Sequence, residues 1–313
     1  EENMESREKA NKEYPLISVI VPTYERSALL TRVLDSIYDQ SWDRIQVVVV
    51  DDNVPGSDWE RETREAIKPY RSRKDFLYVK TSGKLGGGGA RNLGMRQCSG
   101  DYVAFLDDDD RFLPDKLLKQ IHFILENELD GCYQDVIWKD DREKLVEYRS
   151  LDFTGDLSKE GLLKAHILHS LCPTSVYMLR RDKVLETQGF GEVSSGQDFI
   201  LMLRCIEHGL RLAYMPGAYV VQYLHRGPRI SLGDSKIRGE NMLYELKHQY
   251  FPLLLPEERR YVKFRHFAVL AFASARNKKL LHAFGYALRT VAASPADCVK
   301  DGIRFFKSKL RRD

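Results

Sequence analysis

Four consecutive aspartates, Asp107 to Asp110, are the clearest chemical feature of the sequence. They directly follow the apolar, strand-like run 102–106 and come shortly before Pro114, which indicates a turn. Like charges a few Å apart repel strongly where water is scarce. Such a run therefore either stays in water or holds a hard cation such as Mg2+ or Mn2+. Taken alone, it is explained by a solvated acidic turn, whereas a strand end facing a cleft favours the cation.

The segment before this run has the pattern of an α/β fold. Two short apolar runs, 17–21 and 45–50, read as buried strands, and between them residues 28–40 place apolar side chains at helical spacing. Strand, helix and strand in this order predict a mostly parallel sheet flanked by helices, with ligands at the carboxyl ends of the strands.

The alternation continues along the chain. Strands are expected at 76–80, 102–106, 132–138, 174–180 and 211–215, and helices at 58–68, 90–98, 115–127 and 198–208, with a helical pattern throughout after Asn241. We therefore predict a disordered leader or expression remnant at 1–14, a catalytic domain at 15–240 and a basic helical region at 241–313.

A second acidic pair, Asp51 and Asp52, also follows a predicted strand. A turn or a helix N-cap is the commoner use of aspartates at such places. Together with Asp107 to Asp110 on a second strand of the same sheet, however, the pair predicts one cleft. One acidic site would bind a nucleotide, and the other would hold the metal ion that accompanies the nucleotide.

A glycine-rich segment, 83–89, leads into Arg91 and the predicted helix 90–98. Its spacing matches neither a dinucleotide-binding fingerprint nor a P-loop. Five glycines before a helix still allow backbone and Arg91 to approach a phosphate or sugar closely. A flexible linker explains the segment equally well.

Composition narrows the class of protein. The 313 residues are 43% hydrophobic and 30% charged, as in an ordinary soluble protein, and no apolar run reaches the length of a membrane span. The five cysteines are scattered, which favours a reducing cytoplasm. The net charge of +3 is uneven, since residues 257–313 carry 14 Lys and Arg against 5 Asp and Glu.

Four ordered segments, 19–26, 50–53, 89–94 and 100–110, closely resemble the family 2 glycosyltransferases over roughly residues 16 to 225. The resemblance implies a GT-A fold, a nucleoside-diphosphate sugar donor, a divalent cation and inversion at the anomeric carbon. It also implies that the donor-binding residues are Pro22, Thr23, Tyr24, Glu25, Asp52, Arg91, Asp107 and Asp108. Asp52 would accept a hydrogen bond from the base, expected to be uracil, and Asp109 would bind Mn2+ or Mg2+ directly.

Two further positions come from the same resemblance. Asp198 falls on the family's catalytic base, although a helix N-cap is the ordinary explanation of an aspartate there. Gln197 stands where the family usually has Glu, which removes a negative charge beside the base. His225 falls on a histidine that can complete the metal shell, although a lone histidine is more often structural.

We therefore predict a metal-dependent transfer of sugar from a UDP-sugar to a glycan or lipid-linked acceptor in bacterial surface polysaccharide synthesis. A sugar-1-phosphate nucleotidyltransferase fits less well, because Pro22-Thr23-Tyr24 stands where its glycine-rich loop is expected. A non-catalytic nucleotide-sugar-binding scaffold is supported by Gln197 alone. The basic tail suits contact with an anionic membrane from the cytoplasmic side or a helical cap on the catalytic domain, and nucleic-acid binding is not expected.

Overall fold

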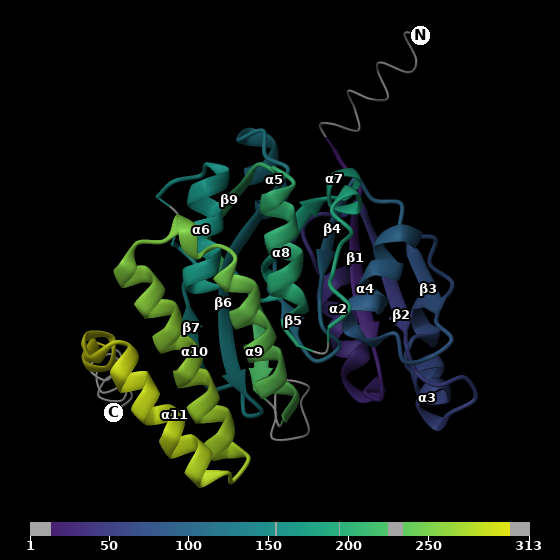
Figure 1. Ribbon diagram of the computed structural model, residues 1–313. Helices are drawn as coiled ribbons and strands as arrows, with labels where there is room; N and C mark the ends of the chain where they lie inside the picture. Colours follow the sequence, from purple (N-terminus) through teal and green to yellow (C-terminus); the bar gives the residue numbers. More distant parts are fainter. Residues whose placement is uncertain (1–13, 154, 194, 225–233, 301–313) are drawn as a thin grey trace. The chain divides into compact units, whose positions relative to one another are not determined.

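The computed structural model describes residues 14–153, 155–193, 195–224 and 234–300 (Figure 1). Within these residues the chain forms two compact units. The first holds most of the chain up to Arg226, and the second holds residues 164–170 and 193–196 and the chain from Gly227 onward.

The described strands form one nine-stranded sheet in the order β3-β2-β1-β4-β8-β6-β9-β5, with β7 paired to β6. The strands are β1 (Ile17–Thr23), β2 (Ile45–Asp51), β3 (Phe76–Lys80), β4 (Tyr102–Phe105), β5 (Arg111–Phe112), β6 (Gly131–Asp140), β7 (Leu145–Arg149), β8 (Met178–Arg180) and β9 (Leu212–Leu224). Strands β3, β2, β1 and β4 are parallel, whereas β8, β5 and β7 run antiparallel to their neighbours.

The helices of the first unit follow the predicted alternation in most places. They are η1 (Ser27–Leu29), α2 (Leu30–Tyr38), α3 (Asp58–Ala66), η2 (Lys68–Tyr70), α4 (Gly86–Gln97), α5 (Lys116–Glu126), η3 (Thr174–Val176), α7 (Arg181–Glu186) and α8 (Gln197–Glu207), while α6 (Lys159–His169) contributes to both units. The predicted strand 174–180 is in fact η3 followed by β8, and α6 and α7 were not predicted.

The parallel strands carry the core of the first unit. Val47 to Val50 of β2 are completely buried, which explains the continuous apolar run, because a strand covered by helices on both faces has no solvent side. Helix α4 packs closely against β1 and β2 (Figure 1). Its Gly94 permits this approach, since a Cβ there would lie 2.6 Å from a methyl of Ile20 and 3.1 Å from one of Val50.

The second unit is helical. It contains α9 (Asp234–His248), η4 (Phe251–Leu253), α10 (Pro256–Arg276) and α11 (Leu280–Ala293). The rings of Tyr244 on α9 and His266 on α10 stack at 4.0 Å, and the imidazole lies 3.3 Å from the carboxylate of Glu240. No helix in the described ranges combines the length and apolar character needed to cross a bilayer.

Candidate active site

Three parallel strands of the first unit end at one edge of the sheet. In register, Thr23 of β1 lies opposite Asp51 of β2, and Ile20 of β1 lies opposite Phe105 of β4. The residues that follow these strands are thus neighbours. The acidic pair 51–52 and the acidic run 107–110 share one edge, as the sequence indicates.

The four aspartates after β4 differ in exposure. The side chains of Asp107 and Asp109 are 35% and 18% exposed, whereas Asp108 and Asp110 are buried. Burial raises the pKa of Asp108 to about 7, and the nearby guanidinium of Arg26 opposes that shift. Burial also raises the pKa of Asp110 well above its ordinary value, and the charges of Asp109 and Asp107 add to the effect.

Asp108 and Asp109 are held by residues at the end of β1 and after it. The hydroxyl of Thr23 donates to Asp108 at 2.9 Å, and Arg26 lies 3.4 Å from the same carboxylate. Arg26 also forms an ion pair with Asp109, whose backbone carbonyl accepts a 2.8 Å hydrogen bond from Arg32. A positive side chain therefore lies between the two carboxylates.

Asp110 is bound by β9 on the far side of the acidic run. The side chain of Gln222 and the backbone amide of Tyr223 donate to its two oxygens at 3.0 and 3.2 Å. The amide oxygen of Gln222 in turn accepts from the indole of Trp138 at 3.0 Å. Asp110 thus has a structural role between strands.

Asp52 organises the start of α4. Its carboxylate accepts hydrogen bonds from the hydroxyl of Thr81 at 2.6 Å and from the amides of Leu85 and Gly86 at 2.9 and 2.8 Å. This carboxylate caps a helix that begins at Gly86 rather than at the predicted residue 90, so Gly86 to Gly89 are helical and do not form a flexible linker. The positive end of α4 is already occupied by a protein anion.

Arg91 connects the acidic run to α8. Its guanidinium forms an ion pair with Asp107 and donates to the side-chain oxygen of Gln197 at 3.4 Å. The fit leaves little room for side chains at Gly87 and Gly88 on the first turn of α4. A Cβ at Gly87 would lie 2.9 Å from the guanidinium, and one at Gly88 would lie 3.1 Å from the amide carbon of Gln197.

The predicted catalytic base lies at the start of α8. Asp198 is the second residue of α8, is half-buried and directly follows Gln197, the residue that Arg91 contacts. The backbone amide of Phe199 donates to its carboxylate at 2.9 Å. His225 lies outside the described residues.

The remaining predicted donor residues line the end of β1. Pro22 is half-buried, whereas the ring of Tyr24 is 41% exposed. Glu25 is exposed in a left-handed conformation, with φ 52°, and its amide donates to the side chain of Asn53 at 2.6 Å. The turn that carries Arg26 is therefore anchored to the end of β2.

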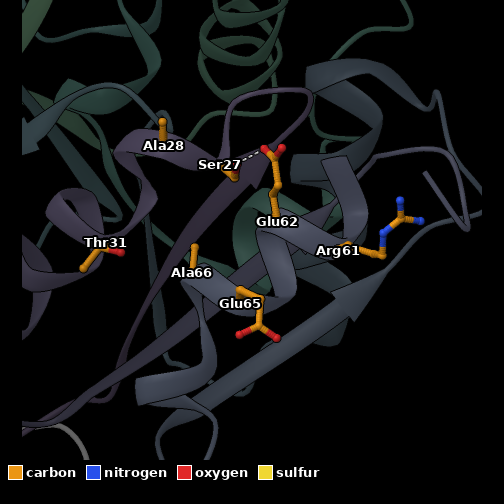
Figure 2. A pocket seen from close by; sticks show the side chains of 7 residues that line it. All are labelled: Ser27, Ala28, Thr31, Arg61, Glu62, Glu65 and Ala66. Carbon is orange, nitrogen blue, oxygen red and sulfur yellow. Dashed lines mark hydrogen bonds between the residues drawn. The ribbon is translucent and has the colours of Figure 1, made fainter. Parts of the chain in front are cut away.

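A cavity of about 500 Å³ lies beside this turn and is lined by Ser27, Ala28, Thr31, Arg61, Glu62, Glu65 and Ala66 (Figure 2). None of these residues belongs to the predicted site. Figure 2 shows the hydroxyl of Ser27 directed at the carboxylate of Glu62 on α3, a 2.9 Å hydrogen bond. This contact fixes the residue next to Arg26.

The carboxylate oxygens of the acidic run are of the kind that bind a hard divalent cation. Across the described ranges no three His, Cys, Asp or Glu side chains are grouped as a metal cage. Asp109 nevertheless offers a partly exposed carboxylate that already binds a cationic group, Arg26. Its oxygens fit Mg2+ or Mn2+ held by few protein atoms, with ligand oxygens such as phosphates in the other positions.

Three side chains of the site were missed in the sequence. Arg26 lies within a segment that carried the family resemblance, but its charge alone did not indicate a partner. Arg32 is on the polar side of a predicted helix. Gln222 is 112 positions from Asp110, and no local pattern links the two.

Comparisons with known proteins show the family and the fold of the chain. The family described as "Glycosyl transferase family 2" matches residues 18–187, more than half of the chain. The Campylobacter jejuni protein GalNAc(5)-diNAcBac-PP-undecaprenol beta-1,3-glucosyltransferase is 27% identical over 225 residues, 71% of this chain and 69% of that protein.

Two solved structures share the fold. TarS 1-349 of S. aureus in complex with UDP-GlcNAc has a TM-score of 0.60, 19% identity and coverage of 89% of each chain. The mannosyltransferase PcManGT of Pyrobaculum calidifontis, in complex with GDP-Man and Mn2+, has a TM-score of 0.60 and 19% identity, and covers 93% of this chain and 80% of that one. The predicted GT-A α/β fold is confirmed, and the chain belongs to glycosyl transferase family 2.

Proposed function

We propose that this protein is an inverting, metal-dependent glycosyltransferase that moves a sugar from a UDP-sugar to a hydroxyl of a glycan or lipid-linked acceptor. The observation that carries the proposal is the pair of contacts made by Arg91, with Asp107 and with Gln197. They connect the acidic run, which would face the donor, to the residue next to Asp198, whose carboxylate would face the acceptor.

The donor nucleotide would lie at the ends of β1 and β2. The exposed ring of Tyr24 offers a surface on which a base can stack, and Pro22 and Thr23 line the same edge. Asp52 already accepts three hydrogen bonds, so its contact with a base would be additional to a structural role. TarS binds UDP-GlcNAc and PcManGT binds GDP-Man, and both complexes support a nucleoside-diphosphate sugar as donor.

Asp109 would hold Mn2+ or Mg2+, with Asp107 and Asp108 beside the donor. When bound, the cation offsets the negative charge that develops on the leaving diphosphate. Arg26 lies against Asp109 and would have to give up this contact. The Mn2+ complex of PcManGT supports a divalent cation as cofactor.

Asp198 would act as the base. As the acceptor oxygen attacks the anomeric carbon, the hydroxyl proton passes to the carboxylate of Asp198, and the bond from that carbon to the diphosphate oxygen breaks. Gln197 accepts from Arg91, a contact that a glutamate could also make. The presence of Gln197 in place of a glutamate therefore does not favour a non-catalytic scaffold.

The acceptor would be a growing surface glycan. The Campylobacter jejuni relative is named for a glycan on undecaprenol diphosphate, which supports a lipid-linked acceptor at the cytoplasmic face of a membrane. Cys98, Cys132 and Cys205 are buried as thiols, which is compatible with a reducing compartment.

Donor turnover tests the proposal. With Mn2+ and a panel of UDP-sugars, the protein should release UDP, and Asp198→Asn should keep donor binding while losing at least about 100-fold in turnover. Glu160→Gln, an exposed acid in the first turn of α6, is the matched control and should remain active. Pyrophosphate release from UTP and a sugar-1-phosphate, or full activity of Asp198→Asn, would contradict the assignment.

A further inference from the structure

Helix α11 carries an exposed apolar stripe. The stripe consists of Leu280, Leu281, Phe284, Leu288 and Val291, whose exposed fractions are 70, 89, 66, 57 and 52%. Their spacing places them on one side of the helix. The other side packs on α10, where the ring of Tyr286 stacks with that of Phe267 at 6.5 Å and Thr290 is buried.

Such a stripe is unusual for a helix that only covers its neighbour. Single exposed apolar residues are common on soluble proteins, but five on one face of a 14-residue helix form a contiguous surface. The packing on α10 already uses the side that bears Tyr286 and Thr290. The stripe therefore serves a contact outside this helix pair.

The charges near the stripe indicate the kind of partner. Residues 276–300 contain Arg276, Lys278, Lys279, Arg289 and Lys300 against a single acid, Asp297. Lys278 and Lys279 are exposed and directly precede the stripe. Asp297 lies 3.9 Å from Lys300, so it does not neutralise the two lysines. An apolar face with basic residues at its end matches a helix lying in the interface of an anionic bilayer.

We propose that α11 docks on the surface of an anionic membrane, with the apolar stripe in the headgroup region and Lys278 and Lys279 against anionic lipid. A second copy of the chain fits less well, because it would bring the same positive charge to the same face. The docking does not depend on the donor chemistry, and lipid binding can be measured without substrate.

Vesicle sedimentation tests the proposal. The full chain should sediment with vesicles of phosphatidylglycerol and phosphatidylcholine, less with phosphatidylcholine alone, and less again at high salt. The double variant Leu281→Glu/Phe284→Glu should lose about tenfold or more in vesicle affinity, because two side chains no longer enter the bilayer. Lys278→Glu/Lys279→Glu should abolish the preference for anionic vesicles.

Leu145→Glu is the matched control, because Leu145 on β7 is 54% exposed and lies in the first unit. It should bind vesicles like the unmodified protein. Circular dichroism and thermal unfolding establish that each variant is folded. Unchanged vesicle binding by Leu281→Glu/Phe284→Glu, or no binding by the unmodified protein, would overturn the proposal. So would a dimer, present without vesicles, that this variant converts to a monomer.

Discussion

Arg91 on α4 donates a hydrogen bond to Gln197 on α8 across 106 positions of sequence, and the same guanidinium pairs with Asp107. Two nitrogens of one planar group thus set the spacing between the acidic run and α8, whose second residue is the proposed base. A lysine has a single charged nitrogen and is unable to reproduce both contacts with the same geometry.

Arg91→Lys should therefore lower kcat/KM for sugar transfer by about 100-fold, because a small displacement of a reacting group has a large effect on rate. Steady-state kinetics with the best UDP-sugar measures this change. Arg96→Lys, on the exposed side of the same helix, provides the control and should be neutral. Equal kinetics for the two variants would remove Arg91 from the site.

Arg26→Ala should increase the affinity for Mn2+ in the absence of nucleotide by about tenfold, because the guanidinium between Asp108 and Asp109 competes with the metal. Electron paramagnetic resonance of free Mn2+ gives the affinity directly. Arg61→Ala removes an arginine that pairs with Asp58 on exposed α3 and should leave Mn2+ binding unchanged. Weaker Mn2+ binding by Arg26→Ala would show that the arginine does not compete with the metal.

Asp52→Ala should lower the free energy of unfolding by about 3 kcal/mol, because it removes three hydrogen bonds to a buried carboxylate at the start of α4. Thr81→Val removes one of these bonds and should cost about 1 kcal/mol. Urea unfolding of the ligand-free protein compares the two. If Asp52→Ala weakened nucleotide binding without any loss of stability, Asp52 would serve the ligand alone.

Lys116 predicts a pH dependence of stability. This side chain is completely buried on α5, donates to Gln120 at 2.6 Å, and lies 4.2 Å from the centre of the Phe112 ring. Burial lowers the pKa of Lys116 to about 7. Between this value and its ordinary 10.5 the unfolded chain binds the proton more tightly than the folded protein, so stability should rise with pH over that window.

Lys116→Met should lack this rise, which amounts to about 3 to 5 kcal/mol for a shift of this size. Thermal unfolding between pH 6 and pH 10 measures the slope. The exposed neighbour provides the comparison, since Lys119→Met should retain the slope of the unmodified protein. Parallel curves for the Lys116→Met and unmodified proteins would mean that the lysine does not titrate in this range.

The first half of the sheet could be predicted because its signals are local. The strands expected at 17–21 and 45–50 are Ile17–Thr23 and Ile45–Asp51, and the helix expected at 28–40 is Leu30–Tyr38. A buried parallel strand appears in the sequence as a continuous apolar run, and an amphipathic helix appears as apolar residues that recur about every 3.6 positions. The acidic residues that end β2 and β4 could be placed on one edge for the same reason.

What could not be predicted depends on contacts between distant residues. Helix α4 begins at Gly86 rather than at 90 because Asp52, 34 positions earlier, accepts from its first amide. Strand β5 has two residues and no pattern of its own, and it exists as a partner of β9. The position of Arg26 between Asp108 and Asp109 could not be predicted either, because the charge of a side chain does not indicate which residue it contacts.

The hydrogen bonds that β9 donates to Asp110 have a consequence for the order of folding. The family match covers residues 18–187. Gln222 and Tyr223, which donate hydrogen bonds to the last aspartate of the run, come after that range. A fragment that stopped before β9 would carry all four acids but lack the strand that pairs with β5. Ordering of the turn that carries the four aspartates should therefore be a late event in folding, completed only when the chain returns from more than a hundred residues away.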